Sequence, residues 1–256
     1  MQNIADLAKK YFPNTKLCRC GGAHQICLNC AVCRADEPDE LYEPTHGIAG
    51  IIDATLLKAD AKSQDIIALC EMANQFKTAS VCINSFYIPL VKSLLKNVKS
   101  CTVINFPLGA GSLEALAAEA EAVIQAKVDE VDMVQNLAAL KSGELAANLA
   151  NTAAVAQKCI KAGVLLKVIL ETCYLNQDEL ILSCLISKKA GAKYVKTSTG
   201  FGSSGAKAED IALMRAVVGP KFGVKASGGI RDKETAQKMI AAGANRIGAS
   251  SVAALL

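Results

Sequence analysis

From about residue 47 onward, short runs of apolar residues alternate with longer segments in which apolar residues recur every three or four positions. Short runs rich in Val and Ile are typical of buried strands, and the wider spacing is typical of helices that bury one face. The pattern predicts eight strands: Gly50–Leu56, Ala79–Ile83, Cys101–Phe106, Glu130–Val134, Leu165–Glu171, Ala192–Thr197, Gly223–Ala226 and Arg246–Ala249.

Helices are expected between these strands. The expected segments are Gln64–Gln75, Pro89–Lys96, Ser112–Lys127, Leu145–Lys161, Asp178–Lys189, Ala208–Val217 and Asp232–Ala242, with a stub at Ser251–Leu256. Strands that alternate with helices form parallel sheets, so the pattern predicts an α/β protein of the (β/α)8 TIM-barrel class. A doubly wound sheet is the alternative, but no G-x-G-x-x-G motif opens a first helix.

Residues 1–46 differ in character from the barrel, which we expect to span residues 47–256. Residues 1–12 place apolar side chains on one helical face, and Pro13 ends the pattern. This predicts a short helix that packs on the barrel, frays in solvent or docks a partner. Residues 36–44 are acidic and contain proline, which is typical of a linker.

Several potential metal ligands lie between that helix and the linker: Cys18, Cys20, His24, Cys27, Cys30 and Cys33. Zinc takes about four such ligands and can order a segment that has little core of its own. An iron–sulfur cluster fits the spacing less well, because a fourth ligand is missing from the usual place. Unliganded thiols are the alternative, and the sequence leaves the choice open.

Composition excludes several classes of protein. The net charge of +4 is not gathered in a basic block and aromatic residues make up 4% of the chain, so nucleic acid is not an expected partner. Charged residues interrupt the first dozen positions, so no secretory signal is expected, and no apolar run is long enough to span a membrane. Eleven cysteines in a chain this long and core-rich do not indicate a disulfide scaffold, which favours a reducing cytoplasm.

Two lysines stand at the ends of predicted strands. Lys196 is followed by hydroxyl residues and glycines, and Lys225 repeats the arrangement about 29 residues later. The ends of parallel strands in a barrel are where chemistry takes place. Two amines held close together favour a neutral form of one of them, which can then act as a nucleophile near pH 7.

Carboxylates and a further lysine fall within apolar strands. Alternate residues of a barrel strand point inward, so Asp53, Asp132 and Lys167 are expected to share the interior with the two lysines. A buried ion network without catalytic function is one interpretation. Several strand-borne charges together with two terminal lysines favour catalysis over it.

The last two strands are followed by loops of small residues, at Ser227–Gly229 and Gly248–Ser251. Such loops expose backbone N–H groups to an anion, and in barrels they often bind phosphate. Ordinary turn chemistry is the alternative explanation.

Residues 47–256 resemble deoxyribose-phosphate aldolase, a class I aldolase family of the (β/α)8 type. The resemblance rests on motifs spread over the whole barrel: Asp53–Lys58, Asn105–Pro107, Asp129–Val134, Leu165–Thr172, Lys196–Phe201, Lys225–Arg231 and Gly248–Ser251. It implies reversible cleavage of 2-deoxyribose 5-phosphate to glyceraldehyde 3-phosphate and acetaldehyde, with neither metal nor cofactor. The implied partners are a phosphorylated sugar and aldehydes, with a homodimer as a possible assembly.

The resemblance also implies roles for individual residues. Lys196 would form the Schiff base, Lys225 would promote its deprotonation, and Asp132 would pair with Lys225 and relay protons. The implied substrate-binding residues are Asp53, Thr55, Lys167 and Thr199, and the implied phosphate-binding residues are Gly200, Gly228, Gly229, Ser250 and Ser251.

Three features depart from the family pattern, and a fourth matches it. Ala54 stands where many members have a larger residue, and residues 1–46 have no counterpart in the family pattern. The chain stops at Leu256, so closure of the phosphate site by a C-terminal tail is not expected. Cys82 matches a family cysteine that can react with aldehydes, although a small buried side chain explains it equally well.

The sequence leaves two other functions open. One is a different Schiff-base lyase or a transaldolase-type barrel that acts on another phosphorylated sugar. The other is a binding or regulatory barrel that senses metal or redox state through residues 18–33. The presence of Lys196, Lys225 and Asp132 together argues against a catalytically inactive scaffold.

Overall fold

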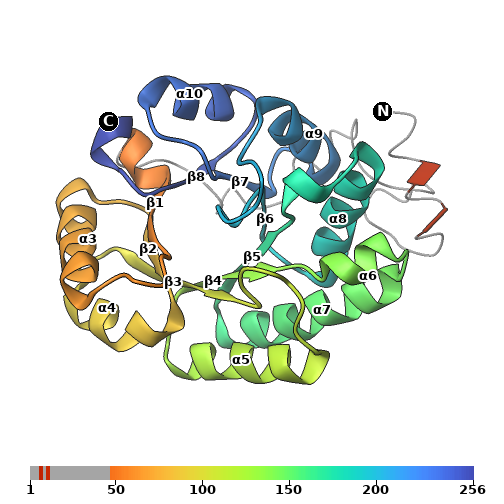
Figure 1. Cartoon of the computed structure of the whole chain (residues 1–256), viewed down its shortest axis with the longest axis horizontal. Helices are drawn as coiled ribbons and strands as arrows, with labels where there is room; N and C mark the ends of the chain where they lie inside the picture. Colours follow the sequence, from red (N-terminus) through yellow and green to blue (C-terminus); the bar gives the residue numbers. More distant parts are fainter. Residues whose placement is uncertain (1–5, 8–9, 12–46) are drawn as a thin grey trace.

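A computed structural model of the chain describes residues 6, 7, 10, 11 and 47–256. Eight parallel strands form a closed barrel in which each strand pairs with the next and β8 pairs with β1. Figure 1 shows the strands as a central ring with the helices outside it. The predicted (β/α)8 class is therefore confirmed.

The strands match the predicted set, with bounds that coincide or differ by one or two residues at either end: β1 Ile52–Leu56, β2 Ser80–Ile83, β3 Lys99–Ile104, β4 Glu130–Val134, β5 Leu165–Ile169, β6 Tyr194–Lys196, β7 Gly223–Ser227 and β8 Arg246–Ala249. The predicted extensions to Phe106 and Glu171 are wrong. Asn105 and Glu171 have φ angles of 53° and 55°, which turn the chain out of the extended conformation.

The helices are α3 Ser63–Phe76, α4 Ile88–Leu94, α5 Leu113–Gln125, α6 Leu137–Lys141, α7 Leu145–Ala162, α8 Gln177–Ala190, α9 Ala208–Val218 and α10 Lys233–Ala241. Short 3-10 turns occur at Gly47–Ile51, Ser85–Tyr87, Thr172–Tyr174 and Ala253–Leu255. The pattern did not predict α6, which is only five residues long. Among the described residues, no helix is long and apolar enough to cross a membrane.

The main core lies between the strands and the surrounding helices. The outward residues of the strands, such as Val81, Val131 and Val195, are fully buried there against helix residues such as Leu116 and Ile211. Each fully buried aliphatic side chain of this kind contributes about 1.5–3 kcal/mol relative to exposure. The core therefore holds the barrel rigid and leaves its interior to other side chains.

Part of the predicted N-terminal helix is described. Residues 6, 7, 10 and 11 are helical, and Leu7 is buried in the main core. The remainder of that helix, the candidate ligands Cys18 to Cys33 and the acidic segment 36–44 lie outside the described residues.

Candidate active site

Charged side chains from six of the eight strands meet inside the barrel, because alternate residues of each strand point inward. They are Asp53 on β1, Glu130 and Asp132 on β4, Lys167 on β5, Lys196 on β6, Lys225 on β7 and Arg246 on β8. All are at most 8% exposed. Buried charges at this density are retained only when they pair with one another.

Asp132 lies at the centre of this network. Its Oδ2 accepts from Lys196 Nζ at 2.9 Å and from Lys225 Nζ at 2.7 Å. Its Oδ1 accepts from Lys167 Nζ at 2.8 Å and from the Cys101 thiol at 3.3 Å. Burial alone would raise the pKa of Asp132, but the three ammonium groups hold it well below its usual value. Asp132 is therefore a fixed negative charge shared by three amines.

A second set of pairs involves residues that the sequence prediction did not single out. Arg246 donates from Nε to Asp53 Oδ1 at 2.6 Å and from Nη2 to the Glu130 carboxylate at 2.8–2.9 Å. Asp53 also accepts from Ser80 Oγ at 2.6 Å. Glu130 and Arg246 begin their strands, so this layer supports the lysines from the opposite end of the barrel.

The three lysines differ in how firmly carboxylates hold them. Lys167 pairs with Glu130 at 2.6 Å, with Asp132 at 2.8 Å and with Asp53 at 3.7 Å. Lys225 pairs with Asp53 and with Asp132. Burial lowers the pKa of both lysines, but the carboxylates outweigh it and raise each pKa above its usual value. Both lysines are therefore positively charged across the physiological pH range.

Lys196 is held differently. Among the described residues its carboxylate partner is Asp132, and it ends β6, at the rim where barrel chemistry takes place. The three carboxylates of the network already face three cations, Lys167, Lys225 and Arg246. A neutral Lys196 leaves these formal charges balanced. Among the described residues, Lys196 is thus a fourth cation facing three carboxylates.

The other predicted substrate-binding residues have partners within the protein. Asp53 and Lys167 are fully buried in the network. Thr55 is half-buried, and its hydroxyl donates to the carbonyl of Asp53 at 2.8 Å. Thr199 is 7% exposed, and its hydroxyl contacts the carboxylate of Glu171. The arrangement gives these side chains supporting positions around the lysines and the loop after β6.

The side chains next to the network around Cys101 are less polar. Leu57, Cys82, Cys101 and Val103 form a small buried cluster against which Phe106 packs. A hydrogen bond with Cys101 holds the pKa of Cys82 below its usual value, whereas burial and Cys82 raise the pKa of Cys101. The cluster supplies an apolar wall beside the amine network.

One group of potential metal ligands occurs in the described part of the chain. Ligand atoms of Cys82, Cys101 and Asp132 lie within 4.8 Å of one another. Both oxygens of Asp132 face ammonium groups, so lysines already supply the positive charge there. This donor set does not fit a divalent cation.

The loops after β6 and β7 pack closely together. A Cβ added at Gly205 would collide with the carbonyl of Gly228, and Ala206 N donates to the carbonyls of Ser227 and Gly228 at 3.1 and 3.0 Å. A Cβ at Gly228 would lie 3.8 Å from the Cα of Gly200. Two of the predicted phosphate-binding glycines are thus neighbours.

The remaining predicted phosphate residues lie on the same rim. Gly229 follows Gly228, and both have positive φ angles, of 77° and 83°. Ser250 and Ser251 are exposed directly after β8, which is hydrogen-bonded to β7. The rim therefore offers backbone N–H groups and hydroxyls after the strands that carry Lys196 and Lys225.

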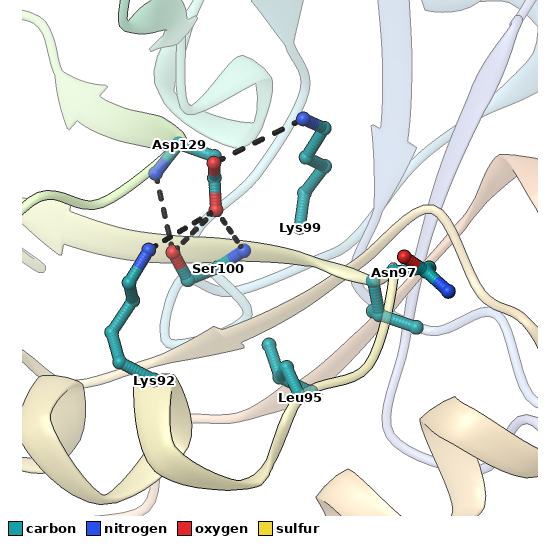
Figure 2. A pocket seen from close by; sticks show the side chains of 7 residues that line it. Lys92, Leu95, Asn97, Lys99, Ser100 and Asp129 are labelled. Carbon is teal, nitrogen blue, oxygen red and sulfur yellow. Dashed lines mark hydrogen bonds and ion pairs between the residues drawn. The ribbon is translucent and has the colours of Figure 1, made fainter.

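A pocket of about 360 Å³ lies elsewhere, beside the start of β3. Figure 2 shows Asp129 there between Lys92 and Lys99, each 3.9 Å from its carboxylate, while Ser100 donates to the same group at 2.7–2.8 Å. This is the N-terminal face of the barrel, whose residues in this fold serve stability. The charged interior is the better candidate for catalysis.

A family model described as "DeoC/LacD family aldolase" matches residues 49–256. The deoxyribose-phosphate aldolase of Brevibacillus brevis is 54% identical over 202 residues, which cover 78% of this chain and 90% of that protein. The deoxyribose-phosphate aldolase of Mannheimia succiniciproducens is 53% identical over 211 residues, or 82% of this chain and 93% of that protein.

Solved structures agree with these matches. The tetrameric deoxyribose phosphate aldolase of Aeropyrum pernix is 33% identical, with a TM-score of 0.75, and the match covers 81% of this chain and 88% of that one. A protein described as "QR15, an Aldolase" is 36% identical, with a TM-score of 0.77, and the match covers 80% and 92% of the two chains.

Proposed function

Because the chain belongs to the DeoC/LacD family of aldolases, we propose that it reversibly cleaves 2-deoxyribose 5-phosphate to glyceraldehyde 3-phosphate and acetaldehyde. The observation that carries this proposal is the pairing of Lys196 with Asp132, beside a second amine that stays charged. Class I aldolases need a neutral amine that can form an imine with the substrate. We assign this role to Lys196, whose carboxylate partner, Asp132, also contacts Lys167 and Lys225.

The proposed reaction starts at the aldehyde carbon of the open-chain sugar. Lys196 Nζ adds to this carbon, and loss of water leaves an iminium that withdraws electrons from the adjacent carbon. Removal of the C3 hydroxyl proton then breaks the C2–C3 bond, which releases glyceraldehyde 3-phosphate and leaves an enamine. Protonation of the enamine and addition of water release acetaldehyde and regenerate the amine.

Asp132 and Lys225 would assist these proton transfers. Asp132 Oδ2 contacts both Nζ atoms, so it can align Lys196 and accept hydrogen bonds from the carbinolamine that forms there. Because its pKa is held well below the usual value, Asp132 does not retain a proton. Lys225 supplies a positive charge that disfavours a second ammonium at Lys196.

The other predicted residues would bind and position the substrate. Gly200, Gly228, Gly229, Ser250 and Ser251 would hold the phosphate through backbone N–H groups and hydroxyls on the rim after β6, β7 and β8. Asp53, Thr55 and Lys167 would act by fixing the network, since their polar groups have partners within the protein. No metal or cofactor is needed, because the iminium is the electron sink.

We also infer a cytoplasmic enzyme that works as a homodimer. Six cysteines of the described part are free thiols, which suits a reducing compartment.

Self-association is supported by the relative from Aeropyrum pernix, which is described as tetrameric. Light scattering coupled to size-exclusion chromatography measures the mass directly, and a monomer or a tetramer at micromolar concentration would contradict the homodimer.

A substrate panel tests the proposed reaction. The full-length protein should release glyceraldehyde 3-phosphate from 2-deoxyribose 5-phosphate and leave fructose 6-phosphate intact. The alternative is a transaldolase-type barrel that acts on a different phosphorylated sugar. Cleavage of fructose 6-phosphate without cleavage of 2-deoxyribose 5-phosphate would favour that alternative.

A further inference from the structure

Glu171 is a buried carboxylate that takes no part in the lysine network. It follows β5, is 2% exposed, and has a φ angle of 55°, a left-handed conformation that is unfavourable for residues other than glycine. Backbone strain of this kind persists only where the surrounding structure holds it in place, often at functional sites. The contacts of the Glu171 side chain therefore indicate its role.

Both carboxylate oxygens of Glu171 face Thr199. The Thr199 N–H donates to Oε1 at 3.1 Å, and the Thr199 hydroxyl donates to Oε2. The same hydroxyl accepts from Phe201 N–H at 3.0 Å. A chain of hydrogen bonds thus runs from Phe201 through Thr199 to Glu171 and fixes the turn that follows Lys196.

The loop after β6 is tightly confined on both sides. A Cβ added at Gly202 would lie 2.7 Å from the sulfur of Cys173 and 3.3 Å from the Glu171 carboxylate. At its other end, the loop is hydrogen-bonded through Ala206 to the β7 loop. The ring of Phe201 also packs edge-to-face on Phe106, with ring centroids 5.5 Å apart. These contacts leave the loop little room to shift. A change at Glu171, which is hydrogen-bonded to Thr199 at the start of the loop, should therefore be felt along the whole loop.

We propose that Glu171 is a positioning residue that, through Thr199, holds the β6 loop in the conformation that receives the phosphate end of the substrate. This inference rests on the proposed function, since Gly200 belongs to the proposed phosphate site. Glu171 bonds to the loop and not to the amines, so its loss should affect phosphate recognition more than imine formation.

The distinguishing substitution is Glu171→Gln. A carboxylate accepts at two oxygens, whereas an amide accepts at one and presents N–H groups at the other position. The variant therefore keeps only one of the two hydrogen bonds that Thr199 donates to residue 171. At the other position the amide N–H2 of Gln faces a Thr199 group that is itself a donor. Thr199→Val removes the hydroxyl, and Thr199→Ser keeps it. Glu179→Gln is a matched control, because this carboxylate lies on the outer side of the barrel at the start of α8.

The experiment measures kcat and KM for 2-deoxyribose 5-phosphate and for 2-deoxyribose without phosphate. Loss of a hydrogen bond to a charged group should raise KM for the phosphorylated sugar about tenfold or more in Glu171→Gln and Thr199→Val. The unphosphorylated sugar should show a much smaller change, and kcat should fall less than KM rises. Thr199→Ser should lie closer to wild type than Thr199→Val, and Glu179→Gln should match wild type.

Binding of inorganic phosphate, measured by calorimetry, provides a readout that does not require turnover. Glu171→Gln should bind phosphate about tenfold more weakly than wild type. Equal phosphate affinity in the two proteins, or an equal rise in KM for both sugars, would overturn the positioning role. If wild type does not cleave 2-deoxyribose 5-phosphate, the proposed function fails, and the phosphate affinities still decide the role of Glu171.

Discussion

Lys196 and Lys225 donate to the same oxygen atom, Oδ2 of Asp132, at 2.9 and 2.7 Å. The two amines come from neighbouring strands whose register places them side by side. Lys225 also forms an ion pair with Asp53, whereas the ion pair of Lys196 in the described structure is with Asp132. This asymmetry supports the proposal that Lys225 stays charged while Lys196 acts as the nucleophile.

Replacing Lys196 with arginine tests its role in the reaction. Arginine keeps the positive charge next to Asp132 but cannot be deprotonated, so no imine forms. We expect Lys196→Arg to fold normally by circular dichroism and to lose at least about 100-fold in kcat/KM for 2-deoxyribose 5-phosphate. Lys193→Arg, at an exposed position on the same strand segment, is the control and should retain activity. Turnover above about a percent of wild type in Lys196→Arg would remove Lys196 from the role of nucleophile.

Replacing Lys225 tests the electrostatic coupling between the amines. The carboxylates of Asp132 and Asp53 raise the pKa of Lys225 despite its burial, so its charge is present throughout the working pH range. Without that charge, Lys196 should keep its proton to higher pH, and the acidic limb of the pH–rate profile of Lys225→Leu should move to higher pH. Lys225→Arg keeps the charge and should leave the limb nearer its wild-type position. If the acidic limb of the pH–rate profile lies at the same pH in wild type, Lys225→Leu and Lys225→Arg, the two amines do not interact.

The buried carboxylates predict how stability depends on pH. Asp53 is fully buried, and although burial alone would raise its pKa, Arg246, Lys225 and Lys167 hold that pKa below its usual value. A carboxylate whose pKa is lower in the folded than in the unfolded state stabilises the fold above its unfolded-state pKa, which is about 4 for Asp. This stabilisation is lost progressively as the pH falls below that pKa. Wild type should therefore be most stable from about pH 5 upward and unfold progressively below about pH 4.

Asp53→Asn isolates this contribution. Removing one partner from a buried network should destabilise the fold by about 3–5 kcal/mol at pH 7, and the loss of stability on acidification should be shallower than in wild type. Glu234→Gln, whose side chain is 79% exposed, should change stability by less than about 0.5 kcal/mol. Chemical denaturation at pH 3 to 7 measures both effects, and an unchanged pH slope in Asp53→Asn would contradict the assignment.

The N-terminal segment should be separable from the chemistry. Deletion of residues 1–46 should leave aldolase activity within about an order of magnitude, since the imine supplies the electron sink. It should also remove any zinc or iron that elemental analysis finds in the full chain. Some stability should be lost, because Leu7 is buried in the main core, and Leu7→Ala is the control for that loss. A truncated barrel that is folded but inactive would place the segment in the active site or in an essential interface.

The sequence was sufficient to predict the barrel and the presence of Lys196, Lys225 and Asp132 in its interior. The spacing of apolar runs reflects burial of both faces of a parallel strand, and Lys196, Lys225 and Asp132 stand at inward positions of such strands. Strand ends were less predictable. Asn105 and Glu171 end their strands by adopting positive φ angles, a conformation that asparagine tolerates better than most residues and that glutamate does not signal.

The partners of the buried charges could not be predicted from the sequence. Arg246 pairs with Asp53 and Glu130, which are 193 and 116 residues away, and only the closure of the barrel brings them together. Likewise, Thr199 was predicted to contact substrate, and its hydroxyl contacts Glu171 in the structure. A pattern of inward positions identifies the side chains that enter the interior, but the register between strands decides which of them meet.

The most direct test of the central claim is to trap the imine and locate it. The full-length protein is incubated with acetaldehyde, reduced with borohydride and digested, and the modified lysine is identified by mass spectrometry. The account predicts one ethylated lysine, Lys196, and no trapping in Lys196→Arg. Modification of Lys225 or Lys167 in place of Lys196, or no stable adduct in an active preparation, would contradict it.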